Sequence, residues 1–425
     1  MDTPPEQLTT TAFVGEARAV AARLQALGRD VTVDVIAGEA LRDKGYGGLW
    51  GVGKAAAEPP ALCVLSYVPA AAAKSVCLVG KGIVYDTGGL AIKSVAGMCG
   101  MKMDMGGAAA LMGAFEAAVA IGTETSLHCA LCLAENAVGP GAFRNDDVLT
   151  FFSGVTCEVN NTDAEGRLVL SDGVAHATTP GTLPGGRVPD LVVDMATLTG
   201  AQMVATGKHH AGIFTNDEAT ELAAVAAGKR TGDLCHPLPY APEFHRAQFQ
   251  SKVADFKNSV AARNDAQASC AGNFIGESLH KDYAGAWLHV DIAGPAFKDD
   301  RATGFGVALV LGNEETGVDT RVLEAADAVV EIPTFGFKNS LNIAAAAPVV
   351  VFEVLRQWGA LEAEPGGRLN ALHPGMASHT ARQCASSPCT APRLGARSST
   401  QASPGTLTKP ACSVARANTA SSRAW

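Results

Sequence analysis

The sequence lacks both the long apolar run of a membrane protein and the leader of a secreted one. No stretch of roughly 18 apolar residues occurs, and aromatic residues make up only 6%, so no transmembrane helix is expected. The opening MDTPPEQLTT lacks the basic-then-apolar order of a secretion signal. We therefore expect a cytoplasmic protein with no membrane partner.

The cysteines do not form a disulfide framework. There are 11 of them, an odd number without framework spacing, which is typical of reduced thiols in a cytosolic core. Cys129 and Cys132 form a lone CxxC in a segment of strand character, where residues three apart point to opposite faces. We expect two buried thiols, with a redox pair as the weaker alternative.

The residues that are abundant indicate a globular α/β protein. The chain has 425 residues, of which 47% are hydrophobic, 18% are charged and 46 are glycine. At about 100–200 residues per domain, this length allows two or three domains. A net charge of −9 makes nucleic acid an unlikely partner for the chain.

Strand-like and helix-like segments alternate from about residue 74 to residue 304. This alternation predicts a mixed, mostly parallel central sheet with helices on both faces. The predicted helices are 13–27, 106–121, 166–177 and 218–227; the predicted strands are 31–36, 59–69, 76–85, 127–135, 155–159, 190–194 and 286–292; and a glycine-rich turn is predicted at 45–53.

Two segments concentrate charge in apolar surroundings. They are VGKGIVYDTGGLAIKSVAGMCGMKMDMGGAA and VNNTDAEGRLVLSDG, and both have charges at the carboxyl ends of predicted strands, where open α/β sheets bind ligands. Each aspartate alone is more often solvated or a helix cap. Together, four carboxylates without a histidine favour two hard divalent cations that share a hydrolytic site. These carboxylates are Asp86, Asp104, Asp163 and Glu165.

The motifs VGKGIVYDTGG, KMDMGGAA, NTDAEGRL and VDMATLTGA closely resemble those of the leucyl (cytosol) aminopeptidase family. The similarity spans about residues 14–307 and is densest over 81–200. It implies the leucine aminopeptidase catalytic fold and a metal-dependent aminopeptidase, a hydrolase that cleaves the N-terminal peptide bond with a water activated by two metals.

The resemblance also implies which residues hold the metals. Asp86 and Glu165 would bridge the two ions, Asp163 would complete one site, and Lys81 and Asp104 would complete the other. A lysine ligand must be neutral, which a neighbouring dication favours. Zinc or manganese would be the metal, with magnesium as a third candidate.

Two further charged residues have catalytic counterparts in the family. Lys93 would stabilise the oxyanion of the scissile carbonyl, and Arg167 would hold a bicarbonate ion that acts as the general base. The free α-amine of the substrate would bind one metal, which selects peptides with a free N-terminus. The residues expected to bind substrate are Met101, Thr197, Leu198 and Gly200.

The N-terminal region differs from the family pattern. The family normally begins with a separate domain of roughly 150 residues, whereas residues 1–75 alone precede the catalytic part here. We therefore expect a truncated N-terminal region, and the homo-hexamer of the family is in doubt for this chain.

A second resemblance begins where the first one ends. VLGNEETG and VEIPTFGFKNSLNIAAAA resemble the last two motifs of SPOUT-class RNA ribose methyltransferases, over about residues 307–357. The catalytic motif of that class and the strands that its knot threads are absent. The resemblance implies an S-adenosylmethionine pocket at Gly312, Asn313, Glu314, Ile332, Pro333, Ser340, Leu341 and Asn342.

Four regions are thus expected: 1–75 (truncated N-terminal region), 76–306 (di-metal aminopeptidase domain), 307–360 (SPOUT-like fragment) and 361–425 (disordered low-complexity tail). The tail is rich in Ala, Ser, Thr, Pro, Gly and Arg, which bury too little apolar surface to offset ordering entropy. The alternatives to an active aminopeptidase are an RNA 2′-O-ribose methyltransferase fragment and an inactive chimera.

Three histidines outside these motifs are expected to be structural. His209 and His210 are adjacent in GKHHAG but have no further ligand at metal spacing, so a turn or core position is predicted. His289 alternates within AWLHVDI and is predicted to pack in the core.

Overall fold

The computed structural model describes residues 1–260, 262 and 264–296, which contain both helices and strands. In chain order the elements are α1 (Thr10–Ala26), β1 (Val31–Ala37), α2 (Glu39–Asp43), α3 (Gly47–Gly53), β2 (Ala61–Tyr67), β3 (Ser75–Asp86), α4 (Val95–Met98), η1 (Met101–Met103), α5 (Gly106–Ala120), β4 (Ser126–Asn136), β5 (Val148–Thr150), β6 (Thr156–Glu158), α6 (Gly166–Thr178), β7 (Leu191–Ala196), α7 (Gly200–Thr206), β8 (Ala211–Thr215), α8 (Glu218–Thr231), β9 (Cys235–Pro237), α9 (Pro242–His245), η2 (Arg246–Phe249), β10 (Phe256–Lys257), α10 (Gln267–Gly276) and β11 (Ala286–Asp291).

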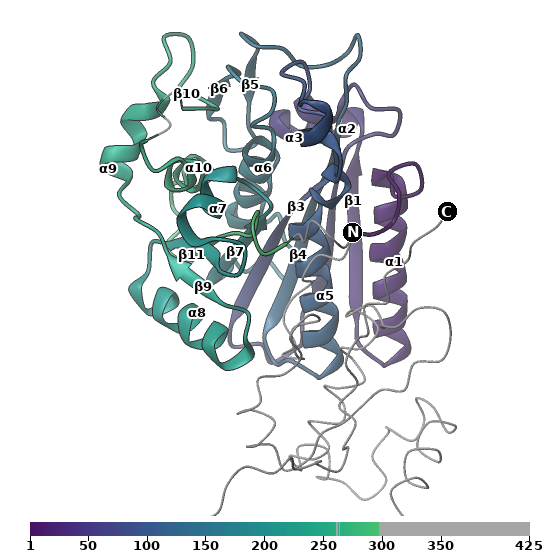
Figure 1. Cartoon of the computed structure of the whole chain (residues 1–425). Helices are drawn as coiled ribbons and strands as arrows, with labels where there is room; N and C mark the ends of the chain where they lie inside the picture. Colours follow the sequence, from purple (N-terminus) through teal and green to yellow (C-terminus); the bar gives the residue numbers. More distant parts are fainter. Residues whose placement is uncertain (261, 263, 297–425) are drawn as a thin grey trace, which may run out of the picture. The chain divides into compact units, whose positions relative to one another are not determined.

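The main sheet has eight strands in the order β1-β2-β4-β3-β7-β11-β8-β9 (Figure 1). Strand β3 runs parallel to both β4 and β7, and β7 runs parallel to β11. The pairs β1–β2, β2–β4 and β8–β11 are antiparallel. The predicted α/β class, with a mixed, mostly parallel sheet, is confirmed.

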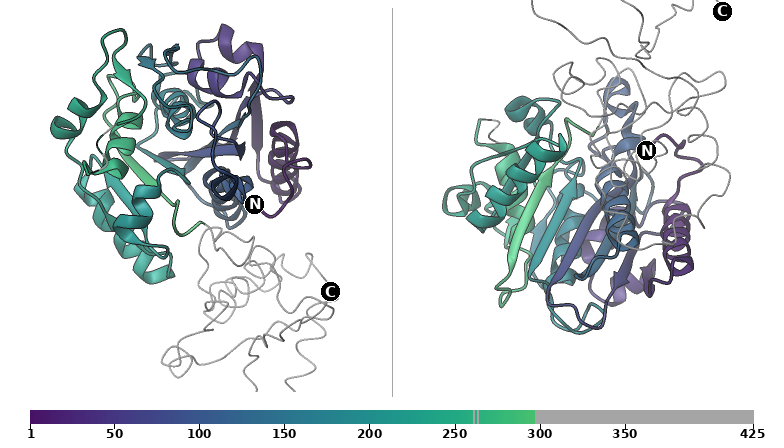
Figure 2. Two further views of the ribbon diagram at one scale, coloured as in Figure 1. Left: turned by 45° about the horizontal axis from the view of Figure 1, so that its top comes forward. Right: turned by 90° about the horizontal axis from the view of Figure 1, so that it is seen from below.

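Helices pack on both faces of this sheet (Figure 2). On one face, Phe13 of α1 and Phe115 of α5 belong to one buried cluster. On the other face, Leu49 of α3, Leu170 of α6 and Phe274 of α10 belong to a second cluster. The strands between them are apolar on both sides, as buried parallel strands require.

Strand β3 lies near the middle of the sheet and carries the first predicted site residues. Its partners β4 and β7 are parallel to it, so the three strands end at the same edge. Lys81 lies within β3 and Asp86 is its last residue. The register between β3 and β4 shifts after Ile83, and Asp86 then pairs with Asn136, the last residue of β4.

The predicted turn at residues 45–53 is wrong, because residues Gly47–Gly53 form helix α3. Its glycines have low helix propensity, so tertiary contacts decide its conformation. Gly48 lies so close to α6 that an added Cβ would be 2.3 Å from the carbonyl oxygen of Leu168. The buried carboxylate of Asp172 on α6 accepts hydrogen bonds from the backbone N–H groups of Leu49 and Phe152, both at 2.8 Å.

The substitution Asp172→Ala is expected to lower the free energy of unfolding by about 2–5 kcal/mol, because two buried N–H groups lose their acceptor. Urea denaturation measures this loss. Asp255→Ala is the matched control, since exposed Asp255 accepts two hydrogen bonds from Thr156 that water can replace. If both variants lost the same free energy of unfolding, the burial of Asp172 would not be what makes its hydrogen bonds stabilising.

Residues 1–75 contribute β1 and β2 to the same sheet as the later strands. Cys129 and Cys132 are buried free thiols in clusters on opposite faces, as expected. Within the described part of the chain, no helix combines the length and apolar character needed to cross a membrane.

Candidate metal centre

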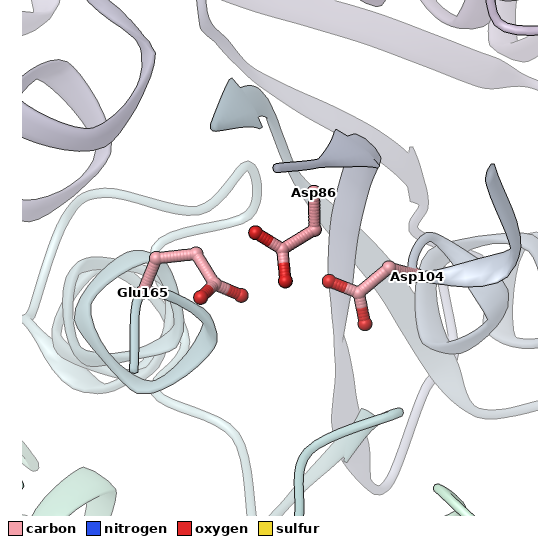
Figure 3. A group of neighbouring side chains, drawn as sticks. All are labelled: Asp86, Asp104 and Glu165. Carbon is pink, nitrogen blue, oxygen red and sulfur yellow. The ribbon is translucent and has the colours of Figure 1, made fainter. Parts of the chain in front are cut away.

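Three carboxylates converge beyond the carboxyl edge of the sheet. Asp86 ends β3, Asp104 follows η1, and Glu165 immediately precedes α6. One ligand oxygen from each lies within 4.8 Å of the others, and all three residues are buried. Figure 3 shows the three side chains directed toward a common space. The elements that carry them come from distant parts of the sequence and are brought together by the parallel order of the sheet.

The Lys81 side chain reaches into this group from within β3. Its Nζ lies 2.8 Å from Asp104 Oδ1 and 3.0 Å from Glu165 Oε1, and it also donates to the Thr197 carbonyl oxygen at 3.0 Å. Burial alone would lower the pKa of Lys81, but the carboxylates, Asp104 first, outweigh burial and raise the pKa above its usual value. The ammonium is therefore the stable form among these carboxylates.

Lys93 and Asp163 form a second ion-paired group next to the first. The Nζ of Lys93 lies 2.8 Å from Asp86 Oδ2 and also pairs with Asp163 Oδ1. Burial would lower the pKa of Lys93, but Asp86 and then Asp163 raise it overall. Asp163, the fourth predicted carboxylate, thus contacts Lys93 and lies outside the group of three within 4.8 Å.

The two lysines do not balance the charge of the four carboxylates. Burial, followed by the repulsion of Asp86, raises the pKa of Glu165. Burial also raises the pKa of Asp104, although Lys81 opposes this shift. Two negative charges remain uncompensated when all six groups are ionised, and such a buried cluster attracts a further cation.

The donor set fits divalent metal ions. Glu165 Oε2 is buried and has no hydrogen-bond partner among the described residues, which is costly for a carboxylate unless a cation binds there. Carboxylate oxygens suit hard or borderline dications such as manganese, magnesium and zinc. The residues that the sequence suggested as metal ligands are therefore chemically able to hold such ions.

The carboxylates lie in a cavity of about 830 Å³. The cavity is lined by every metal, catalytic and substrate residue that the aminopeptidase resemblance suggested: Lys81, Asp86, Lys93, Met101, Asp104, Asp163, Glu165, Arg167, Thr197, Leu198 and Gly200. The cavity volume is typical of a ligand site.

Arg167 occupies a distinct part of the cavity wall, in the first turn of α6. Its Nη1 donates to the carbonyl oxygen of Asn258 at 2.8 Å. Its Nε is buried and has no hydrogen-bond partner among residues 1–260, 262 and 264–296. Burial lowers the pKa of Arg167, and Glu165 opposes this shift. A buried guanidinium with a free donor is a potential anion contact.

Several lining residues have no counterpart in the sequence predictions. Met103, Met203, Leu238 and Val260 add apolar surface, and Gln267 lines the cavity from the start of α10. Met103 lies within the KMDMGGAA motif, but nothing in the local sequence of the other four residues distinguishes them from ordinary core or surface residues.

The remaining predicted residues lie elsewhere. His209 is exposed and His210 is partly exposed, both in the connection between α7 and β8, away from the cavity lining. His289 is buried, as predicted, and its Nδ1 pairs with Asp194 at 2.5 Å. The SPOUT-like residues Gly312, Asn313, Glu314, Ile332, Pro333, Ser340, Leu341 and Asn342, and the predicted tail 361–425, fall outside the described residues.

A sequence profile described as the catalytic domain of the cytosol aminopeptidase family matches residues 1–311. The mouse protein named probable aminopeptidase NPEPL1 is 52% identical over 311 residues, which cover 73% of this chain and 57% of that protein. This chain therefore spans little more than half the length of that relative.

Solved structures show the same similarity. A leucyl aminopeptidase from Trypanosoma cruzi superposes with a TM-score of 0.68 at 54% identity, covering 72% of this chain and 58% of that chain. The bottromycin maturation enzyme BotP, solved in complex with Mn, superposes with a TM-score of 0.64 at 36% identity, covering 70% and 62% of the two chains.

Proposed function

We propose, since the chain belongs to the cytosol aminopeptidase family, that it is a metal-dependent aminopeptidase that hydrolyses the N-terminal peptide bond of peptides. The observation that carries the proposal is the convergence of Asp86, Asp104 and Glu165 within 4.8 Å. These carboxylates lie in a cavity large enough for a peptide end. Hydrolysis at two metals needs this combination of excess negative charge and an open volume beside it.

The residues that would hold two divalent ions are Lys81, Asp86, Asp104, Asp163 and Glu165. When bound, the ions supply Lewis-acid polarisation of the scissile carbonyl and lower the pKa of water. Manganese is the first ion to test, because a relative was solved with it, and zinc is the second. Lys81 would act as a neutral amine ligand. The dication would then neutralise the charge of Asp104 and Glu165, which the Lys81 ammonium neutralises in the absence of metal.

Lys93 is proposed to stabilise the negative charge that develops on the carbonyl oxygen. Its side chain is 17% exposed and lies on the cavity wall between Asp86 and Asp163. Those two carboxylates keep it protonated, as the raised pKa indicates. A charged donor fixed beside the reacting carbonyl is typically worth about 3–4 kcal/mol in transition-state stabilisation.

Arg167 is proposed to hold a bicarbonate ion that acts as the general base. Its buried Nε has no protein partner among the described residues, while Nη1 is fixed by Asn258. A planar guanidinium can donate two parallel N–H groups to two of the oxygens of a planar anion such as bicarbonate. The bound anion would then accept the proton that water loses during attack.

Substrate selection is proposed to follow from metal binding and shape. The free α-amine of the substrate would bind one of the two metal ions, which favours peptides with a free N-terminus and therefore exopeptidase activity. Met101, Thr197 and Gly200 line the cavity and would contact the first side chain, and the Leu198 carbonyl oxygen would accept a hydrogen bond from the substrate. A methionine beside small residues suits apolar side chains. Cytoplasmic peptides with a free N-terminus are the proposed substrates.

Treatment of the purified full chain with a chelator is expected to abolish hydrolysis of a leucyl-anilide, and Mn²⁺ or Zn²⁺ is expected to restore it. The released aniline is followed by absorbance before chelation, after it and after metal addition. An N-acetylated leucyl-anilide is the control substrate and should not react, because it lacks the free amine. Undiminished turnover by the chelated protein would rule out the metal-dependent mechanism.

A further inference from the structure

Two uncharged side chains connect the separate segments that bear the carboxylates. Asn136 ends β4 and Thr162 lies in the loop before α6, and both are 0% exposed. Neither residue lines the cavity. Their hydrogen bonds nevertheless run directly to the metal-binding segments.

Asn136 contacts both segments through a single amide nitrogen. Its Nδ2 donates to Asp86 Oδ1 at 2.8 Å and to the Thr162 carbonyl oxygen at 3.0 Å. The backbone N–H of Gly88 also donates to Asp86 Oδ1, at 2.9 Å. With two donors on Oδ1, the carboxylate is oriented so that its other oxygen, Oδ2, faces Lys93.

The Thr162 hydroxyl fixes the turn that follows β3. It donates to the Gly88 carbonyl oxygen at 2.7 Å and accepts from the backbone N–H of Ala91 at 2.7 Å. The turn is closed by the Lys93 N–H, which donates to the Thr87 carbonyl oxygen at 2.9 Å. Thr162 thereby ties the backbone just before Asp163 to the turn that ends at Lys93.

The glycines of this turn allow its backbone to lie close to the side chains of Asn136 and Thr162. Gly88 and Gly89 have φ values of +84° and +62°, which side-chain-bearing residues rarely adopt. An added Cβ on Gly89 would lie 2.9 Å from Asn136 Oδ1 and 3.0 Å from Thr162 Oγ1. The turn therefore packs directly against the two connecting side chains.

We propose that Asn136 and Thr162 are positioning residues that hold Asp86 and Lys93 in register with Asp163 and Glu165, and that metal affinity depends on them. This inference rests on the proposed two-metal function. Partners that orient metal ligands typically change affinity by about 10- to 100-fold when removed. Four hydrogen bonds that join two ligand segments are a direct way to provide such orientation.

If Thr162 served only to stabilise the fold, its removal would lower stability without changing metal affinity. Thr178 provides a matched comparison for this distinction. Thr178 in α6 is also buried, and its hydroxyl donates to the Val174 carbonyl oxygen at 2.8 Å and accepts from the His280 N–H at 2.9 Å. Thr162→Val and Thr178→Val therefore remove the same kinds of hydrogen bond with the same change of shape. The two variants should therefore lose similar amounts of stability. Only Thr162→Val removes hydrogen bonds to the segment that carries Asp86 and Lys93.

The test is calorimetric titration of the chelator-treated full chain with Mn²⁺, together with thermal denaturation of each metal-free variant. Thr162→Val is expected to weaken Mn²⁺ binding about 10- to 100-fold, whereas Thr178→Val should bind like the wild type. Thr162→Ser keeps the hydroxyl and should restore most of the affinity. Equal affinities of Thr162→Val and the wild type, or equal weakening by Thr178→Val, would overturn the inference.

Asn136→Leu provides a second, shape-conserving variant should Thr162→Val not fold. It removes both amide donations and is expected to weaken Mn²⁺ binding by a similar factor. Wild-type affinity in Asn136→Leu would overturn the role of Asn136. If the wild-type protein itself bound no Mn²⁺, the proposed two-metal function would fail first, so the two failures are distinguishable.

Discussion

Replacing Glu165 with glutamine is expected to reduce leucyl-anilide hydrolysis by about 10³-fold or more, equivalent to about 4 kcal/mol of transition-state stabilisation. Glu165 has a buried carboxylate oxygen, Oε2, with no hydrogen-bond partner in the described part of the chain. Glutamine keeps the shape but removes the charge that a metal ion needs. Activity assays at saturating Mn²⁺ and calorimetric titration together measure the effect.

The same substitution is expected to raise the stability of the metal-free protein. Burial and the neighbouring Asp86 raise the pKa of Glu165, so its ionised form is held at a cost in the absence of metal. A neutral amide removes that repulsion, and the melting temperature of metal-free Glu165→Gln should exceed that of the metal-free wild type. Opposite changes in activity and stability are typical of a functional cluster.

Glu277→Gln is the control for both measurements. Glu277 is a partly buried carboxylate that pairs with Arg246 outside the cavity. Its replacement should leave metal affinity and turnover unchanged. Near-normal hydrolysis by Glu165→Gln, with normal metal affinity, would show that Glu165 is not a ligand and would remove the central support of the proposed function.

The second large effect is expected for Lys93→Met, which should retain metal while kcat falls about 10²- to 10³-fold. Methionine fills a similar volume but carries no charge to stabilise the developing oxyanion. Loss of the ammonium leaves Asp86 and Asp163 without their shared cation, so Mn²⁺ affinity should stay equal or increase. KM should change little, because the lost interaction belongs to the transition state.

The separation of metal affinity from kcat makes this prediction specific. Lys257→Met is the control, since Lys257 pairs with Glu158 and lies outside the cavity. Stopped assays over a range of substrate concentrations give kcat and KM, and calorimetry gives the metal affinity. Ordinary turnover by Lys93→Met would contradict the oxyanion role, and loss of metal would instead make Lys93 part of the metal-binding structure.

Most of the central fold could be predicted from the sequence. The helix α5, the strands β3, β4 and β7, and the helix α6 match the predicted segments closely, because their apolar patterns and lengths are strong local signals. Helix α3 could not be predicted, since its conformation depends on Asp172 and on the close approach of Gly48 to α6. Short strands such as β9 and β10 likewise exist only through their partners.

The candidate site also contains some residues that the sequence predicted and others that it did not. The charged residues stood out because Lys81, Asp86 and Glu165 are polar groups in apolar segments, and every one of the predicted aminopeptidase-type residues lines one cavity. The apolar lining, such as Met203 and Val260, comes from segments without a local signal. The positioning role proposed for Asn136 could not be predicted from the sequence either, because it depends on hydrogen bonds to residues that are distant along the chain.

The sequence by itself determined which chemical groups are present and the order of the elements that carry them. It specified carboxylates, two lysines and an arginine within family-like motifs, because residue type and local periodicity are properties of the chain alone. The tertiary structure decided which of these groups meet. Asp104 contacts Lys81, whereas Asp163 contacts Lys93, because parallel strand order and the Asn136 and Thr162 hydrogen bonds fix how distant segments align.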